Sequence, residues 1–418
     1  MIGHSPDGYG RMALTMAVTP RSRVLCLVLA GGRGSRLGAL TTGRAKPSLP
    51  VGGHYRLIDI SLSNAAHSGL SDVWVLQQYE PHLLNEHLAG GRPWDLDRTR
   101  GGFRTLPPFE GHDRDGFASG NADALARNWP LIDAFDPDIL LVCSADHLER
   151  HDFRNAIAAH QDSDADVTVI TTELPRGTDC SRYLVVQGDG HRVREVDYKP
   201  ERPRGRLIGT EVFLYRPHRL AETLRDLREE GGDLGDYGDR LIPRMLETST
   251  VTEHRHEGHW RDLGTPEAYL DGQLELLRPR PPLRLDDPDW PMLTSMPVRG
   301  PARIDRSADL DQAWISPGAH VAGTVVHSII GPGVTVERGA TVRHSVVMAD
   351  AVIRRDATVA RAVVAEQAII GSRATIGAPQ ARRPVLVGAR RRVAAGRSLT
   401  AGEQLEPNSP RDLWSSVR

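Results

Sequence analysis

The stretch VLCLVLAGGRGSRL, residues 24–37, decides how the first part of this chain folds. VLCLVLA is a short apolar run that ends in a glycine cluster, which predicts a buried β-strand followed by a tight turn. Glycines in such a turn let backbone N–H groups approach an anion closely. The stretch therefore predicts a strand with an anion-binding turn at its carboxyl end.

Strand-like and helix-like segments alternate around this stretch, from about residue 23 to residue 278. This rhythm predicts a Rossmann-like α/β domain with a mostly parallel sheet and helices on both faces. In such sheets, ligands gather beyond the carboxyl ends of the strands. The predicted strands are 24–30, 72–78, 138–146 and 166–174; the predicted helices are 59–70, 80–88 and 121–135; residues 93–117, rich in Gly, Pro and charge, are predicted to form a long mobile loop.

A different pattern begins after a proline-rich stretch, where aliphatic residues recur every six positions with occasional fives. No helix keeps a period of six on one face, but a triangular parallel β-helix does, with one inward aliphatic residue per short strand. The repeat therefore predicts a solenoid. Its predicted inward residues are Ile330, Val336, Val342, Met348, Ile353, Val359, Val364, Ile370 and Ile376.

These patterns divide the chain of 418 residues into five parts. We expect a disordered N-terminal extension over 1–22, with Met12 or Met16 as alternative starts, and a catalytic α/β domain over 23–278. A linker over 279–310, a β-helix over 311–378 and a C-terminal tail over 379–418 complete the expected organisation.

Composition excludes several classes of protein. A net charge of −2 leaves no electrostatic footprint for nucleic acid. No apolar run approaches 18 residues, and the N-terminus lacks the apolar region of a secretory signal. The three cysteines show no metal-ligand spacing, which suits a reducing compartment. We therefore expect a cytoplasmic protein that binds neither nucleic acid nor membrane.

Basic residues surround the glycine turn. Arg33, Arg36 and Lys46 lie within fourteen residues of one another and would place several positive charges around a polyphosphate. Neither the dinucleotide fingerprint nor a Walker A motif fits this stretch. Lysine itself is rare, because among 52 lysines and arginines it occurs only at Lys46 and Lys199, each followed by proline. An ammonium is a compact point charge and a guanidinium a wide planar fork, so these positions suit a narrow phosphate site.

The motifs AGGRGSRL (30–37), RAKP (44–47), GGHYRLIDISLSN (52–64), ADH (145–147) and WRDLGTPEAY (260–269) carry a family resemblance. The chain resembles the nucleoside-diphosphate-sugar pyrophosphorylases, and most closely the bacterial ADP-glucose pyrophosphorylases. The resemblance runs from about Val24 to Ile376. It implies a nucleotidyltransferase domain followed by a left-handed parallel β-helix, assembled as a homotetramer.

The resemblance also implies roles for individual residues. Arg36 and Lys46 would hold the nucleotide phosphates, and Asp146 and Asp262 would hold Mg²⁺, the cation that bridges the reacting phosphates. Gln78 matches the glutamine that reads the base. The remaining nucleotide-binding positions are Ala30, Gly31, Gly32, Arg33, Gly34, Gly120 and Asp123, and the sugar-phosphate positions are Lys199, Tyr198, Glu211 and Asp262.

Several positions depart from the family pattern, and they lie around the sugar. ASGNAD stands in place of YRGTAD, DYKP in place of VEKP, YLV in place of FGV and GTEVF in place of SMGIY. The altered residues are Ala118, Ser119, Leu184, Tyr198, Gly209 and Glu211. Losing hydroxyl partners shifts sugar specificity by orders of magnitude, so the reaction type is better supported than the sugar.

The resemblance implies that ATP and glucose 1-phosphate are converted to ADP-glucose and pyrophosphate. Three alternatives stay open at this point. The first is a weakly active regulatory paralogue that binds sugar phosphates, and the second is a pyrophosphorylase for another sugar phosphate or nucleotide. The third is a bifunctional acyltransferase that works through its β-helix. Intact phosphate and metal residues favour an active enzyme, and the altered sugar pocket favours the first two alternatives.

Overall fold

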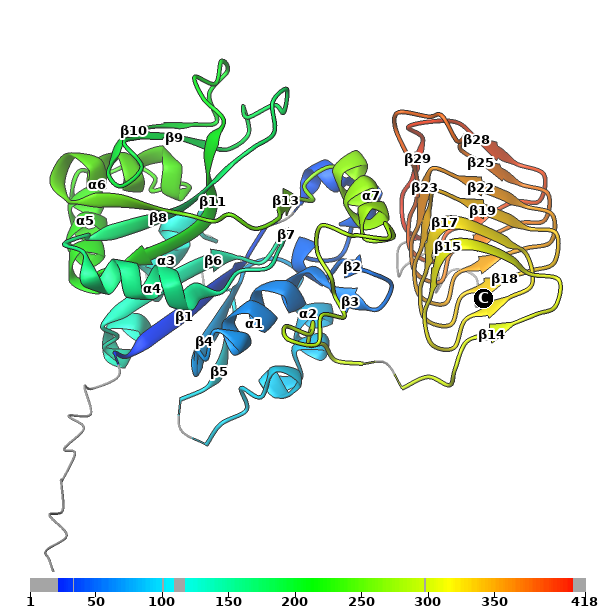
Figure 1. Cartoon of the computed structure of the whole chain (residues 1–418), viewed down its shortest axis with the longest axis horizontal. Helices are drawn as coiled ribbons and strands as arrows, with labels where there is room; N and C mark the ends of the chain where they lie inside the picture. The colour runs from blue at the N-terminus through cyan, green and yellow to red at the C-terminus, as the bar shows by residue number, and fades with distance from the viewer. Residues whose placement is uncertain (1–21, 33, 100, 109–116, 297, 409–418) are drawn as a thin grey trace, which may run out of the picture.

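The computed structural model describes residues 22–408, apart from 33, 100, 109–116 and 297. The N-terminal extension, Met12, Met16 and Arg33 therefore lie outside the described residues, as does the end of the expected tail. Figure 1 shows an α/β domain beside a solenoid of stacked short strands. The two parts were expected from the alternating first half and the six-residue repeat.

The α/β domain is built on a nine-stranded mixed sheet in which β1 (Val24–Ala30) is central. β1 pairs in parallel with β4 (Asp72–Gln77) on one side and with β6 (Ile139–Ser144) on the other. The strand order is β10-β9-β11-β6-β1-β4-β5, with β8 pairing β11 and β12. The other strands are β5 (Phe103–Leu106), β8 (Val167–Glu173), β9 (Leu184–Gly188), β10 (Val193–Tyr198), β11 (Leu207–Tyr215) and β12 (Val251–Arg255).

The two faces of β1 are covered by separate cores, because alternate side chains of a strand point to opposite faces. Leu25 and Leu27 pack in one apolar cluster with residues of α3 and α5, whereas Cys26 and Val28 pack in another with residues of α1, α2 and α4. Because both faces of the sheet are covered at β1, this strand is apolar along its whole length. The helices are α1 (Leu57–His67), α2 (Pro81–Leu88), α3 (Asn121–Phe135), α4 (Phe153–Asp162), α5 (Pro217–Glu229), α6 (Ile242–Thr248) and α7 (Pro266–Glu275).

The solenoid is a stack of short parallel strands that repeat every 17 residues over most of its length. Val325 pairs with Val342, which pairs with Val359, which pairs with Ile376. Seventeen residues correspond to two hexads and one pentad per turn, and this confirms the β-helix. Its strands are β14 (Arg303–Ile304), β15 (Asp309–Ile315), β16 (His320–Val321), β17 (Thr324–Ile330), β18 (Thr335–Val336), β19 (Thr341–Arg343), β20 (Val346–Val347), β21 (Val352–Ile353), β22 (Thr358–Ala360), β23 (Ala362–Val364), β24 (Ile369–Ile370), β25 (Thr375–Ile376), β26 (Val385–Val387), β27 (Arg392–Val393), β28 (Ser398–Leu399) and β29 (Gln404–Leu405).

Two details of the solenoid differ from the expectation. Val347, not Met348, joins the solenoid core, and Met348 packs outward in a cluster shared with the catalytic domain. The strands β26–β29 also continue the stack to Leu405, inside the segment expected to be a tail from residue 379. An inserted stretch at 377–384 interrupts the repeat there, so the sequence periodicity stops before the fold does.

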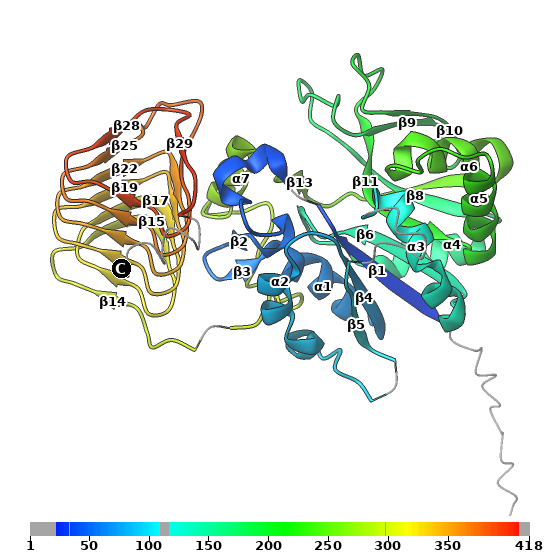
Figure 2. The same ribbon diagram turned by 180° about the vertical axis from the view of Figure 1, so that it is seen from behind.

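The solenoid docks on the catalytic domain through an interdomain apolar cluster. Its members come from the glycine turn, α7, the linker and the solenoid, and include Leu37, Leu49, Leu270, Leu285, Ile329, Met348 and Leu386. Figure 2 shows α7 facing the edge of the solenoid at β29. Two ion pairs flank the cluster, Arg361 with Asp271 of α7 and Arg44 with Glu366. The solenoid therefore contacts the segment that carries the predicted phosphate residues.

None of the helices in the described part of the chain is both long enough and apolar enough to cross a membrane.

Candidate active site

The site forms where the carboxyl ends of β1 and β6 meet. The two strands run parallel with Leu29 opposite Ser144, so the glycine turn after β1 lies beside the turn that carries Asp146. The backbone N–H of Ala145 donates to the carbonyl of Leu29 and fixes the two turns together. This is the edge of the sheet at which a ligand was predicted.

The glycine turn packs against Lys46. Gly34 has a φ of 65°, in the left-handed region, and a Cβ there would lie 3.0 Å from the Cβ of Lys46. A Cβ on Gly31 would lie 2.8 Å from Oε1 of Gln78, whereas one on Gly32 would meet no atom within 4 Å. Gly31 and Gly34 are therefore required by close packing, and Gly32 leaves backbone open to a ligand.

Lys46 joins the two predicted metal-binding carboxylates. Its Nζ lies 2.7 Å from Oδ2 of Asp146 and 3.1 Å from Oδ1 of Asp262. Burial alone would lower the pKa of Lys46, but the charges of Asp146 and then Asp262 raise it above its ordinary value. Burial alone would likewise raise the pKa of Asp146, but Lys46, followed by His147, holds it well below the usual range. Lys46 and Asp146 are therefore both charged at neutral pH.

A small second sheet brings Asp262 to Asp146, although 116 residues separate them in the sequence. The strand β7 (His147–Glu149) pairs antiparallel with β13 (Trp260–Asp262), with Asp262 directly opposite His147. Ser144 donates a hydrogen bond to Asp146 and orients its second oxygen. The two carboxylates thus converge because one follows β6 and the other ends β13.

Arg36 lies on the open side of this cluster. Its side chain is exposed, and a Cβ on Gly264 would lie 3.0 Å from its Nη2 and 2.8 Å from Oδ2 of Asp262. Gly264 therefore leaves room for Arg36 and Asp262 to lie side by side. Arg36 adds a positive charge that a bound polyphosphate could reach.

The predicted base-reading side of the site is formed by Gln78 and the start of α3. Nε2 of Gln78 donates to the carbonyl of Ala118 at 2.8 Å, which leaves Oε1 beside Gly31. Asp123 is engaged structurally, because it accepts from the backbone N–H of Ser119 at 3.1 Å and pairs with Arg127 at 2.9 Å. Gly120 packs directly on the backbone of Gly235, with no room for a side chain.

Lys199 belongs to a second, more open cluster at the end of β10. Its Nζ lies 3.2 Å from Oδ2 of Asp236 and 4.3 Å from the centre of the Tyr198 ring. The hydroxyl of Tyr198 donates to the same oxygen at 2.9 Å. Asp236 was not predicted; it lies in the loop GGDLGDYGD, whose Gly–Asp composition indicates only a turn.

Glu211 connects the two clusters. Its carboxylate, the imidazole of His147 and the carboxylate of Asp146 offer ligand atoms that all lie within 4.8 Å of one another. Nδ1 of His147, the histidine of the ADH motif, is buried without a hydrogen-bond partner among the described residues. Carboxylate oxygens are the ligands that hard divalent cations prefer, so the converging carboxylates of Asp146 and Glu211 fit such an ion. Glu211 thus lies near Asp146 on the phosphate side, and its charge also acts on Tyr198 on the sugar side.

Comparisons with known proteins agree with this geometry. Residues 25–278 match the family described as Nucleotidyl transferase, and residues 301–383 match the GlmU-like C-terminal hexapeptide family. The glucose-1-phosphate adenylyltransferase of Thermosipho africanus is 35% identical over 318 residues, covering 76% of this chain and 77% of the relative. Those of Pseudothermotoga lettingae and Clostridium acetobutylicum are 38% and 34% identical, each over 76% of this chain and over 76% and 84% of the relatives. This chain therefore belongs to the nucleotidyl transferase family, within its glucose-1-phosphate adenylyltransferase branch.

Proposed function

We propose that the chain transfers the adenylyl group of ATP to a sugar 1-phosphate, with glucose 1-phosphate as the reference substrate, and releases pyrophosphate. The single observation that carries this proposal is Lys46 held between Asp146 and Asp262 at the carboxyl edge of β1 and β6. A phosphate site needs a fixed positive charge, and a divalent cation needs two converging carboxylates. The names of the relatives support the choice of ATP and glucose 1-phosphate.

The reaction is an in-line displacement at the α-phosphorus of the nucleotide. An oxygen of the sugar phosphate forms the new bond to that phosphorus, and the bond to the bridging oxygen of the β-phosphate breaks. The electron pair leaves with pyrophosphate, and no proton transfer is needed because the attacking phosphate oxygen is already ionised. Catalysis then rests on positioning and charge neutralisation rather than on a general base.

Each part of the site has a task in this displacement. Arg36 and Lys46 bind and orient the triphosphate, and Lys199 binds the phosphate of the sugar. Asp146 and Asp262 would hold Mg²⁺, which supplies neutralisation of the charge that accumulates on the reacting phosphates. Lys46 shares both carboxylates with that ion, so binding of the nucleotide would redistribute its contacts.

The test is release of pyrophosphate by the purified protein with ATP, Mg²⁺ and a panel of sugar 1-phosphates. We expect turnover with at least one sugar phosphate and none with EDTA. The Asp146→Asn variant should lose about 10²–10³ in kcat. A regulatory paralogue would instead bind sugar phosphate, detectable by calorimetry, without measurable turnover on any member of the panel.

Assembly and location are part of the same proposal. We propose a homotetramer that associates partly through the solenoid, in the cytoplasm. The solenoid presents exposed apolar side chains at Ile304 and Leu310, beside its first strands. Sedimentation of the full chain should give four times the mass of the protomer; a monomer at micromolar concentration would contradict the assembly.

A further inference from the structure

The two oxygens of the Asp146 carboxylate face different neighbours. Oδ2 lies 2.7 Å from Nζ of Lys46, which also lies 3.1 Å from Oδ1 of Asp262. Oδ1 of Asp146 accepts a hydrogen bond from Ser144 and lies 3.4 Å from Nε2 of His147. An ammonium therefore occupies the Oδ2 side of the carboxylate, whereas no lysine or arginine of the described chain pairs with Oδ1.

Three ligand atoms converge near this carboxylate. One atom each from Asp146, His147 and Glu211 lie within 4.8 Å of one another, and the described residues contain no other such group of metal-ligating side chains. Ligands that lie about 2.0–2.6 Å from one ion are at most about 4–5 Å apart, so this spacing fits one divalent cation. Asp262 is not a member of the group. The group is thus distinct from the pair of carboxylates that Lys46 joins.

The imidazole of His147 is available as a metal ligand. Its ring is buried and packs against that of Trp260, with 4.8 Å between the ring centres, so packing fixes its orientation. Nδ1 is buried and has no hydrogen-bond partner among the described residues, although buried polar atoms nearly always have one. The ring therefore keeps a nitrogen that no hydrogen bond of the described chain uses.

Glu211 is held near Asp146 by an unfavourable backbone conformation. Its φ is 60°, in the left-handed region that disfavours a residue with a Cβ. Glycine would adopt this conformation without strain but would bring no carboxylate. The hydroxyl of Tyr237 hydrogen-bonds to the carboxylate of Glu211. Such outer partners orient the ligands of metal sites. Strain of this kind is typical of functional positions, and here it directs a carboxylate to the group of three.

The three ligand types select among cations. Mg²⁺ takes oxygen ligands and keeps several waters, whereas imidazole is a ligand of first-row transition metals. Two carboxylates with one imidazole therefore favour an ion such as Mn²⁺ over Mg²⁺. The side chains of Asp146 and Glu211 lie on residues that are only partly buried, so an ion can reach them from solvent and retain water ligands.

We propose that Asp146, His147 and Glu211 form a second divalent-cation site, which takes a transition-metal ion of the Mn²⁺ class in preference to Mg²⁺. This site goes beyond the proposed function, which needs only Asp146 and Asp262 as carboxylate ligands of Mg²⁺. The charge of Glu211 acts on Tyr198, beside Lys199, so the site faces the proposed sugar phosphate. A cation there offsets the negative charge that an incoming sugar phosphate would otherwise meet.

Binding of Mn²⁺ to the protein without nucleotide or sugar phosphate measures this site, because Lys46 then holds the carboxylates of the other one. We expect an EPR titration to show one bound Mn²⁺ per chain, with an affinity at least about tenfold higher than that of Mg²⁺ in competition. Pulsed EPR should detect hyperfine coupling of the ion to a nitrogen. His147→Gln should remove this coupling and weaken binding of Mn²⁺ by about 10- to 100-fold.

Two variants of Glu211 separate the loss of a ligand from a loss of folding. Glu211→Gln keeps the shape of the side chain and removes its charge. Glu211→Gly removes the side chain and suits a φ of 60°, so it should unfold no more easily than the wild type. Both should weaken binding of Mn²⁺ by about 10- to 100-fold and reduce the rise in Tm that Mn²⁺ gives the wild type.

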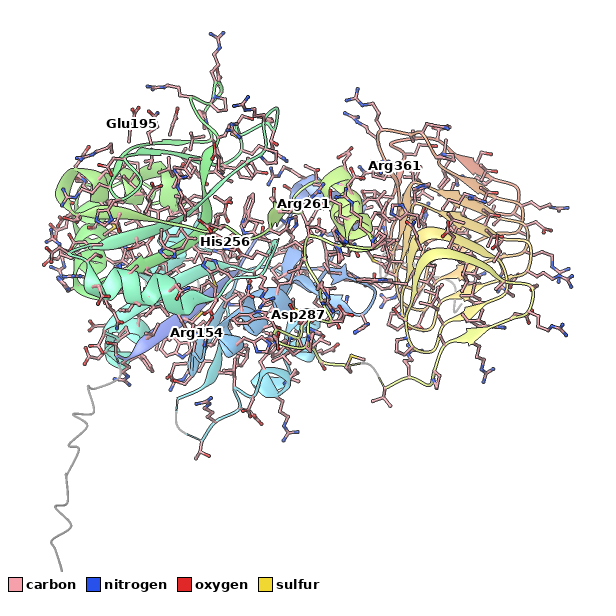
Figure 3. The ribbon with its side chains drawn as sticks, in the orientation of Figure 1. Arg154, Glu195, His256, Arg261, Asp287 and Arg361 are labelled. Carbon is pink, nitrogen blue, oxygen red and sulfur yellow. The ribbon has the colours of Figure 1, made fainter. Side chains whose placement is uncertain are left out.

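Glu195→Gln is the matched control for the removal of a carboxylate charge. Glu195 is exposed on β10 and pairs with Arg204. Figure 3 shows Glu195 on the outer edge of the catalytic domain. This variant should bind Mn²⁺ as the wild type does.

The outcomes separate this inference from the proposed function. Equal affinities for Mn²⁺ and Mg²⁺, without nitrogen coupling, overturn the inference and leave pyrophosphate release with Mg²⁺ as a separate result. Binding that survives unchanged in Glu211→Gly overturns it as well, whatever the stability of Glu211→Gln. Binding that Asp262→Asn abolishes and Glu211→Gly does not would assign the ion to the Lys46 side and overturn it too. Full binding of Mn²⁺ without turnover on any sugar phosphate supports the site and contradicts the proposed function.

Discussion

The two lysines of the chain lie in regions that differ in almost every respect except their predicted ligand. The side chain of Lys46 is 5% exposed and has two carboxylate partners, whereas that of Lys199 is 49% exposed and has one. Lys46 belongs to a turn that packs against the solenoid, whereas Lys199 directly follows β10, which Figure 1 places on the side of the catalytic domain away from the solenoid. Both are followed by buried prolines.

This difference indicates two ways of binding a phosphate. A buried lysine between carboxylates is preorganised, so its orientation costs nothing when charge shifts during the reaction. An exposed lysine keeps its hydration and side-chain freedom until the ligand arrives, and its contribution falls on binding. Lys46 should therefore act on kcat and on stability, and Lys199 on the KM for the sugar phosphate.

Replacing Lys46 should have the largest effect. Lys46→Ala removes the buried ammonium that lies between Asp146 and Asp262, which should lower the free energy of unfolding by about 3–5 kcal/mol. Turnover should fall by about 10²–10³. Thermal unfolding and pyrophosphate release check the two effects. Lys199→Ala is the control and should unfold like the wild type; equal destabilisation of both variants would contradict the comparison.

The next largest effect concerns the ion pair between Glu366 of the solenoid and Arg44, which lies two residues before Lys46. Glu366 of the solenoid accepts from both terminal nitrogens of Arg44, at 2.7 and 2.9 Å, and also lies 3.4 Å from Arg56. Burial alone would raise the pKa of Glu366, but Arg44 lowers it to about 2 from an ordinary 4.5. Because the folded-state pKa is the lower one, the pair stabilises the fold fully above about pH 4.5 and loses that effect as the pH falls toward 2.

Glu366→Gln should therefore lower the free energy of unfolding at pH 7 by something on the order of 3 kcal/mol and flatten its decline between pH 4.5 and 2. Denaturant unfolding at a series of pH values measures both. Asp271→Asn is the matched control, because the pair that Asp271 forms with Arg361 is more exposed. It should lower the free energy of unfolding by less than Glu366→Gln does. An acid profile identical to that of the wild type would contradict the anchoring role of Glu366.

A substitution that keeps the charge separates the two lysines more sharply. Lys199→Arg should raise the KM for the sugar phosphate about tenfold and leave that for ATP nearly unchanged, since a planar fork replaces a point charge at an open site. Lys46→Arg should lower kcat, because the wider guanidinium must fit a buried place between Asp146 and Asp262 that holds a compact ammonium. Steady-state kinetics with each substrate varied in turn decides this. Silent substitutions at both positions would remove the phosphate role of the lysines.

Much of the fold was predictable from the sequence because it depends on local periodicity. The apolar run 24–30 is β1, and the six-residue repeat is the β-helix. The prediction of the inward residue was wrong at Met348, because its neighbour Val347 is also apolar and suits the solenoid core equally well. Only the length of the turn decides which of the two points inward. Periodicity also gave no sign of β26–β29, because they follow an irregular insertion.

The site was predictable only as a set of residue types. The charge and glycine pattern indicated phosphate binding, and the family resemblance paired Asp146 with Asp262. The partners of these residues were not visible in the sequence. Asp236 approaches Lys199, and Glu366 approaches Arg44, through contacts between segments 37 and 322 residues apart. Such pairs depend on how segments distant in the sequence pack, within one domain or between two, and no local pattern encodes them.

The smallest expected effect concerns the base. Gln78 lies beside the glycine turn, with its Nε2 fixed by the carbonyl of Ala118 and its Oε1 beside Gly31. The fixed amide would present one acceptor to the base, and one neutral hydrogen bond contributes about 1 kcal/mol, or about fivefold in affinity. Gln78→Ala should thus raise the KM for ATP about fivefold, narrow the ratio of kcat/KM between ATP and GTP, and leave the KM for the sugar phosphate unchanged. The same assay with both nucleotides measures this ratio.

An unchanged ATP-to-GTP ratio in Gln78→Ala would assign base selection to the start of α3 instead. A parallel rise in the KM for the sugar phosphate would show that Gln78 supports the shape of the whole site rather than the nucleotide end alone.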